Sequence, residues 1–298
     1  NLMTNYNFSS KFKHANIFSL VIFLISVILI SFKGLNYGID FKGGTLIELR
    51  SVNTEVSSIR DVLNNMDLGD VNVKKFGKEG DFLIKVEQKD NYNKLIPIIK
   101  NNLTDNLNSE VNFRRVENVG PKVSAELLQS GIIAISLSLA AMLFYIWVRF
   151  EWQFSIGSIV ALFHDVIITL GIFSFLSLEI NLSIIAAVLT IVGYSMNDTV
   201  VIFDRVRENL RKYSDIKIFE LTNISINETL SRTLITSITT LLALLSIFFF
   251  GGEILKGFSL AMIFGVLFGT YSSIYIANTI LVRLRVSQKT ILKDDDKS

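Results

Sequence analysis

The sequence predicts a polytopic α-helical membrane protein with six transmembrane helices and an exported α/β domain of ferredoxin-like fold. Three observations support this class. Half of the 298 residues are hydrophobic, and the mean hydropathy is +0.46. Six apolar segments approach the roughly 20 residues that a helix needs to cross a bilayer. One polar stretch between the first two segments is long enough to form a small domain.

The apolar segments define the expected spans and the regions between them. They run over 15–33, 131–149, 154–176, 182–203, 233–250 and 257–281. The expected regions are an N-terminal flank with the first span at 1–34, an exported domain at 35–128, a five-helix bundle at 129–281 with a cytoplasmic loop at 204–232, and a cytoplasmic tail at 282–298.

Lysine and arginine in the short connections set the expected orientation. Basic residues gather in the N-terminal flank, in the connection at 204–232 and in the tail. The turns on the opposite side hold only Glu179, Glu253 and Lys256 as charged residues. We therefore expect both termini in the cytoplasm and the long polar stretch on the exported side.

The polar stretch shows alternating hydrophobic residues where strands are expected and helical spacing elsewhere. The order βαββαβ indicates a ferredoxin-like split βαβ layer, a fold that names no function by itself. The stretch contains no cluster of catalytic side chains and no phosphate-binding loop, so we expect no enzyme site. Gly43-Gly44 and Gly120-Pro121 flank it and are expected to form hinges or tight turns. The predicted strands cover 45–50, 71–76, 82–86 and 111–116, and the predicted helices 54–66 and 92–107.

Composition narrows the chemistry further. The chain has no cysteine, which excludes disulfides and a thiolate metal site. Its two histidines, His14 and His164, lie far apart in the sequence and leave little for a zinc site. We expect no metal and no cofactor, and a net charge of +2 gives no reason to expect a nucleic-acid partner.

Asp198 stands inside the fourth apolar segment. An ionised carboxylate there costs roughly 2.5–3.5 kcal/mol on insertion scales, so such residues usually face a bundle interior or a water-filled path. We interpret Asp198 as a functional residue, and the alternative is a hydrogen bond that holds two helices together. Asp165 in the third segment is a secondary candidate, and His164 beside it is either part of a second relay or a packing group.

Arg232 opens the fifth segment, and the predicted orientation places it with Asp198 in the cytoplasmic half of the membrane. Burial favours the neutral form of a carboxyl group, whereas a nearby arginine favours the carboxylate, so the two residues form a switchable pair. Asn197, Thr233 and Thr236 could pass or orient a proton between them. The alternative for Arg232 is an ordinary basic residue at the cytoplasmic end of a span.

Small and polar residues recur at helical spacing in the later spans, as they do where membrane helices pack closely. We expect one stripe on the fourth span to face the bundle interior, and we expect Gly265 and Gly269 in the sixth span to serve packing. The stripe comprises Ser183, Ala186, Ala187, Thr190, Gly193, Tyr194, Asn197 and Asp198.

Five stretches, in order along the chain, carry a family resemblance. They are Gly38–Gly44, Val119–Ser124, Phe163–Asp165, Gly193–Asn209 and Ser231–Leu234. With them the chain resembles SecF proteins of the SecD/SecF protein-export family, in the resistance-nodulation-division superfamily. The stretch in the fourth span is highly specific, whereas the glycine motifs alone would be weak.

The resemblance implies a subunit of the bacterial inner membrane that uses the proton-motive force to assist protein export. It implies a separate SecD partner, together with the SecYEG translocon, its SecA motor, YajC or YidC, and an unfolded preprotein as cargo. Matched residue by residue, Asp198 and Arg232 correspond to the family's proton-transport positions.

Two other functions remain open from the residues alone. The chain could be a structural assembly factor of the translocon without proton transport, although such a factor has no need of a membrane carboxylate at Asp198. It could also be half of a lipid or drug exporter of the same superfamily. The size of the polar domain speaks against that second alternative, because those exporters typically carry larger exported regions.

Overall fold

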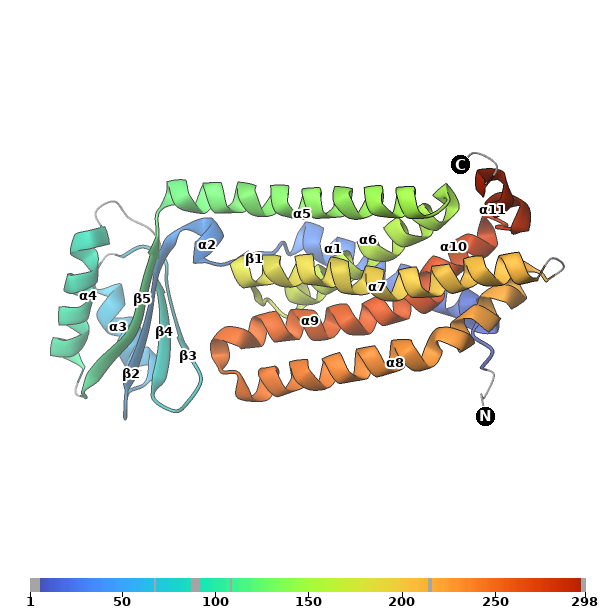
Figure 1. The fold of residues 1–298 in the computed structure, drawn as a ribbon. Helices are drawn as coiled ribbons and strands as arrows, with labels where there is room; N and C mark the ends of the chain where they lie inside the picture. The colour runs from blue at the N-terminus through green and yellow to red at the C-terminus, as the bar shows by residue number, and fades with distance from the viewer. Residues whose placement is uncertain (1–5, 67, 87–91, 108, 214–215, 296–298) are drawn as a thin grey trace. The chain divides into compact units, whose positions relative to one another are not determined.

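The computed structural model describes residues 6–66, 68–86, 92–107, 109–213 and 216–295. The chain divides into two compact units (Figure 1). One unit runs from Tyr37 to Ile133, and the other comprises the chain before Tyr37 and after Ile133.

The unit before Tyr37 and after Ile133 is helical, and among the described residues six helical segments, one of which begins in the other unit, are long and apolar enough to cross a membrane. This confirms the predicted six-span class. Its elements are η1 (Ser9–Lys11), α1 (Phe12–Phe32), α5 (Pro121–Arg149, which begins in the other unit), α6 (Trp152–Phe175), β6 (Glu179–Ile180), α7 (Leu182–Lys212), α8 (Ile218–Phe250), α9 (Glu253–Ser272), the π-helical η2 (Ser273–Ala277), α10 (Asn278–Arg283) and α11 (Gln288–Asp295), with the two-residue β1 (Asn36–Tyr37) at the boundary.

The connection at 204–232 is mostly helical. Helix α7 continues to Lys212, and α8 already begins at Ile218. Hydropathy marks where a helix leaves the membrane and not where it ends. Beyond the apolar segment, Val206 and Leu210 keep the helical spacing and are buried, so they give the extension a face to pack.

The last span is interrupted by a wide turn. Helix α9 passes at Ser272 into the π-helical η2, which leads directly into α10. Such turns inside an α-helix are rare and occur frequently at functional sites. Here the turn follows Ser272 and begins with Ser273, and both side chains are fully buried.

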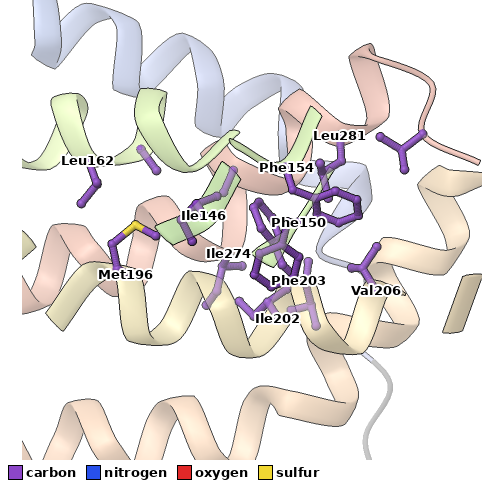
Figure 2. Close-up of a cluster of buried hydrophobic side chains, with 14 of the residues drawn as sticks. Ile146, Phe150, Phe154, Leu162, Met196, Ile202, Phe203, Val206, Ile274 and Leu281 are labelled. Atoms are coloured by element: carbon purple, nitrogen blue, oxygen red, sulfur yellow. The ribbon is translucent and has the colours of Figure 1, made fainter. Parts of the chain in front are cut away.

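Aromatic side chains fill one part of the helical core. Phe150 follows α5, and its ring centroid lies 5.7 Å from that of Phe154 on α6, which lies 5.1 Å from that of Phe203 on α7. Figure 2 shows the three rings gathered among aliphatic side chains, including Ile202. Aromatic pairs at these distances stabilise beyond the area they bury. The cluster therefore fixes α6 against α7, the two helices that carry the buried carboxylates.

The unit from Tyr37 to Ile133 has a four-stranded antiparallel sheet in the order β3-β4-β2-β5. The two longer helices and the sheet share one hydrophobic core. This is the predicted βαββαβ order, and the strand order is that of a split βαβ layer. Its elements are α2 (Ile39–Lys42), β2 (Gly44–Ser51), α3 (Val56–Asn64), β3 (Val71–Lys75), β4 (Asp81–Val86), α4 (Tyr92–Asn106) and β5 (Val111–Val119).

The two glycine motifs differ in structure. Gly43 and Gly44 have φ of 77° and 132°, and a Cβ at Gly44 would lie 2.7 Å from the carbonyl oxygen of Val86, so only glycine fits there. Pro121 is the first residue of α5, where its missing N–H leaves no hydrogen bond unmade. The carbonyl of Gly120 accepts from the N–H of Ser124 at 2.9 Å and so starts that helix.

Helix packing gives a direct test of the fold. A Cβ at Gly171 of α6 would lie 2.3 Å from Cβ of Ser26 on α1, whereas at Gly193 of α7 the nearest atom would be 4.0 Å away. We expect Gly171→Ala to destabilise the protein by about 1–3 kcal/mol through overpacking. Gly193→Ala, with the same gain in helix propensity, should not destabilise it. Thermal unfolding in detergent measures both, and equal unfolding temperatures would contradict the α1–α6 packing.

Candidate functional site

Asp198 lies on α7 with only 3% of its surface exposed. Its Oδ2 is buried and has no hydrogen-bond partner among the described residues. The neighbours that act on its carboxyl group are the charge of Arg232 and a hydrogen bond with the side chain of Thr270. The structure thus brings together the two residues that the sequence singled out, and it adds Thr270.

Arg232 and Asn197 are both exposed in this chain. The predicted stripe on the fourth span is therefore not wholly interior, because Ala186, Thr190 and Asn197 lie on an exposed edge of α7. Asp198, one position further on, is turned into the bundle. Asp198 thus lies at the border between the exposed face of α7, which carries Asn197, and the buried face.

The two threonines that the sequence singled out, Thr233 and Thr236 on α8, make different contacts. Thr233 is 1% exposed, and its hydroxyl oxygen has no hydrogen-bond partner in the described part of the chain. The hydroxyl of Thr236 donates to the backbone carbonyls of Arg232 and Thr233 at 3.1 and 3.0 Å. The hydroxyl of Thr233, next to Arg232 in the sequence, is therefore available for a further hydrogen bond. The hydroxyl of Thr236 already donates its proton to backbone carbonyls of α8.

Asp165 on α6 is fully buried and fully bonded. Its Oδ2 accepts hydrogen bonds from the hydroxyls of Ser195 on α7 and Ser272 on α9, at 2.6 and 2.7 Å. Its Oδ1 lies 2.9 Å from Nδ1 of His164. The hydroxyl of Thr169 donates to the backbone carbonyl of Asp165 at 2.8 Å. Asp165 therefore joins three helices, as the structural alternative for a membrane carboxylate requires.

Helix α9 connects the two carboxylates. Thr270 contacts Asp198, and Ser272 donates to Asp165. The hydroxyl of Thr270 is also hydrogen-bonded to that of Ser237 on α8, at 2.7 Å. One short stretch of α9 thus touches Asp165 on α6, Asp198 on α7 and Ser237 on α8.

Sequence reasoning missed how these hydroxyls are used. Ser195 lies in the Gly193–Asn209 stretch without an expected role of its own, Ser272 lies near the glycines that we expected to serve packing, and Thr270 carried no signal of its own. Gly269 explains the geometry, since a Cβ there would lie 3.2 Å from Cβ of Ser195. The available clue was the coincidence of Gly269 with a serine three positions later in the same span.

The two buried carboxyl groups differ in how many hydrogen bonds they already accept. Within the described ranges, no group of three or more His, Cys, Asp or Glu side chains could hold a metal ion. Asp198 offers a buried oxygen free to take up a proton, and Asp165 offers a carboxylate whose oxygens already accept hydrogen bonds.

The fold and the site define a polytopic membrane protein that holds titratable groups inside its helical bundle. Residues 99–287 match the family described as "Protein export membrane protein SecD/SecF, C-terminal", and residues 28–55 match the "SecD/SecF GG Motif". The chain belongs to the SecD/SecF family of protein-export membrane proteins.

Named relatives and solved structures agree with this assignment. The chain is 48% identical over 280 residues to "Protein translocase subunit SecF" of Rickettsia bellii (strain OSU 85-389), covering 93% of this chain and 92% of that protein. For the protein of the same name from Rickettsia prowazekii (strain Madrid E) the identity is 47%, covering 93% and 90%. A crystal structure of SecDF from Thermus thermophilus is 36% identical with a TM-score of 0.86, covering 95% of this chain and 39% of that one. A super-membrane-facing form of SecDF is 34% identical with a TM-score of 0.71, covering 99% and 40%.

The bonds to Asp165 can be tested by removing one donor. Ser195→Ala leaves Oδ2 of a buried carboxylate with one donor fewer, and we expect a loss of stability of about 1–2 kcal/mol. Ser158→Ala is the matched control, because Ser158 is 1% exposed and its hydroxyl has no partner among the described residues. Thermal unfolding of both variants in the same detergent checks the difference. A Ser195→Ala protein as stable as the control would show that the hydroxyl does not support Asp165.

Proposed function

We propose that the chain is an accessory subunit of the Sec preprotein translocase that, together with SecD, uses the proton-motive force to assist export of unfolded proteins. Membership of the SecD/SecF family supports the export role. The observation that carries the proton-driven part is Asp198, a buried carboxyl group with one unpartnered oxygen and the charge of Arg232 acting on it. We propose a transport function without chemical catalysis, cofactor or nucleic acid.

Charge placement supports a place in the bacterial inner membrane with both termini in the cytoplasm. In that orientation the domain from Tyr37 to Ile133 is on the exported side, where it would contact preprotein. SecYEG with SecA, and YajC or YidC, are the proposed wider partners, because an accessory subunit must act beside the channel that its cargo crosses.

A SecD partner explains the open side of the bundle. Helices α5 and α8 are mostly unburied, and Arg232 and Asn197 are exposed. The two matched SecDF chains are each more than twice as long as the part that this chain covers. We propose that a separate SecD subunit supplies the other half and covers the exposed edge of α7 beside Asp198.

Protonation of Asp198 would change its interactions in two ways. It cancels the attraction to Arg232, and it turns an accepting oxygen into a hydrogen-bond donor. Thr233, with its free buried hydroxyl, supplies an acceptor on the same helix as Arg232. Uptake and release of a proton would therefore alter how α7 and α8 are held together.

The energy available is sufficient for such a step. One elementary charge crossing 100 mV is worth roughly 2.3 kcal/mol. That amount shifts a two-state equilibrium about 50-fold, which is enough to bias a conformational change. In the proposed cycle this bias moves the exported domain while it holds preprotein.

Asp198→Asn tests the proton-driven function. The substitution keeps the size of the side chain but cannot titrate, so we expect normal expression and normal assembly with SecD and loss of the stimulation of export by a proton gradient. Preprotein uptake into inverted membrane vesicles, with and without an imposed gradient, measures this. Asp204→Asn is the control, because Asp204 lies at the charged end of α7 in an exposed ion pair with Arg149 at 2.8 Å. A variant that responds to the gradient like the wild type would leave Asp198 as a packing residue and favour the structural assembly factor.

The partner proposal has its own test. Vesicles containing SecYEG, SecA and this subunit alone should show only basal export, because the exposed side of the bundle lacks its other half. Addition of SecD should restore the response to the gradient. Co-purification from native membranes, followed by mass spectrometry, should recover SecD with the chain. Full stimulation by the subunit alone would remove the argument for a shared bundle.

A further inference from the structure

His164 and Asp165 form a buried pair that the proposed role of Asp198 does not use. His164 is 5% exposed and Asp165 is 0% exposed. Nδ1 of His164 is hydrogen-bonded to Oδ1 of Asp165, and the hydroxyls of Ser195 and Ser272 donate hydrogen bonds to Oδ2. A carboxylate is an acceptor only, so these three groups satisfy it in its ionised form when the imidazole carries its proton on Nδ1.

The second ring nitrogen of His164 is free. Its Nε2 is buried and has no hydrogen-bond partner among the residues that the structure describes. With the ring proton on Nδ1, Nε2 carries a lone pair and is the atom that accepts a further proton. The ring stacks on Tyr271 with centroids 6.3 Å apart and meets the edge of Phe268 at 6.5 Å.

We propose that His164 and Asp165 form a second proton-binding site of the bundle, in which Nε2 of His164 takes up the proton and Asp165 supplies the counter-charge. A hydronium ion transfers its proton to Nε2, an N–H bond forms there and a water molecule is released. The bond from Nδ1 to Asp165 remains in place, and the pair passes from a net charge of −1 to zero. Release to water reverses each step. The coupling of this site to export rests on the proposed proton-driven function.

The surroundings contain few other groups that could titrate. Helix α6 contributes only the pair itself, and the apolar part of α7 contributes Tyr194 and Asp198. Beyond Lys256, α9 and the turn after it contribute Tyr271 and Tyr275. Between Asn16 and Phe32, α1 contributes none, and its Ser19 hydroxyl and the carbonyl of Ala15 are bonded to the hydroxyl of Tyr271 at 3.1 and 2.8 Å.

Helices α7 and α9 each contact both the His164–Asp165 pair and Asp198 or carry Asp198 itself. Ser195, which donates to Asp165, lies one helical turn before Asp198 on α7. On α9, Thr270 contacts Asp198 and Ser272 contacts Asp165. A change of charge at either carboxyl group therefore acts on the same two helices. This arrangement supports a relay in which the proton bound at one site influences the other.

The protein has only two histidines, which gives a clean measurement. His14 is exposed near the N-terminus, so the His14→Gln protein keeps a single imidazole, that of His164. We would label its histidine with nitrogen-15, reconstitute the full chain in vesicles and record solid-state NMR spectra from about pH 5 to pH 8, where histidine changes charge. We expect the signal of the neutral, Nδ1-protonated ring to convert into that of imidazolium. Asp165→Asn should abolish the conversion in this range. A ring that stays neutral throughout would overturn the proposal.

Coupling is tested in the complete translocase with SecD present. We expect His164→Gln to reduce the response of export to a proton gradient about 10-fold while assembly with SecD is retained. The His14→Gln protein should respond as the wild type does. A full response in His164→Gln would overturn the coupling. If His164 titrates but Asp198→Asn still responds to the gradient, the proposed function falls and the proton site stands. If His164 stays neutral while Asp198→Asn is inactive, the reverse holds.

Discussion

The close approach of α7 and α9 is the constraint on which the interior of the bundle depends. A Cβ at Gly265 would lie 2.2 Å from Cγ1 of Ile191, and one at Gly269 would lie 3.2 Å from Cβ of Ser195. Without hydrophobic driving force between helices in lipid, such packing and the hydrogen bonds it permits hold the bundle together. The same approach brings the hydroxyls of α7 and α9 within reach of Asp165. A larger residue at Gly269 would separate the two donors that this carboxylate needs.

The two buried carboxyl groups differ in how the protein compensates the free-energy cost of removing them from water. Asp165 is placed among hydrogen-bond donors from two other helices, so its burial is compensated by the protein itself. Asp198 keeps one oxygen without a hydrogen-bond partner among the described residues, and the charge of Arg232 on α8 acts on it. A group that is fully satisfied resists change, whereas one that is incompletely satisfied responds to a proton. Under the proposed function, Asp165 holds its charge and Asp198 responds to a proton.

Much of the architecture could be predicted because hydropathy and periodicity are local properties. The six spans and the βαββαβ order follow from runs of a few residues, and Asp198 was identifiable because a carboxylate in an apolar run is costly. Helix α7 ends after its apolar segment and α8 begins before its own, because a helix can continue into water once its core-facing spacing is kept. Val206 and Leu210 carry that spacing among charged neighbours such as Asp204.

The details of the site lay beyond sequence reasoning for a different reason. The partners of Asp165 come from helices that are neighbours only in space, and no spacing rule connects Ser195 to Ser272. Asn197 was expected on the inner face with Asp198, yet consecutive residues on a helix point about 100° apart. When Asp198 faces the interior of the bundle, Asn197 therefore faces its exterior, and the packing of α7 decides which of the two is buried.

The π-helical turn at Ser273–Ala277 adjusts the phase of the last span. In a regular α-helix, two residues eight positions apart differ by two full turns and about 80°. Tyr271 and Thr279 are separated by that number of positions, yet both reach α1, through the carbonyl of Ala15 at 2.8 Å and the side-chain amide of Asn16 at 2.8 Å. A wide turn takes up the excess rotation. The last span can thus keep one face against α1 along its length while Ser272 and Ser273 still point into the bundle. The number of residues in the π-helical turn, as much as their identity, therefore determines which side chains reach the interior of the bundle.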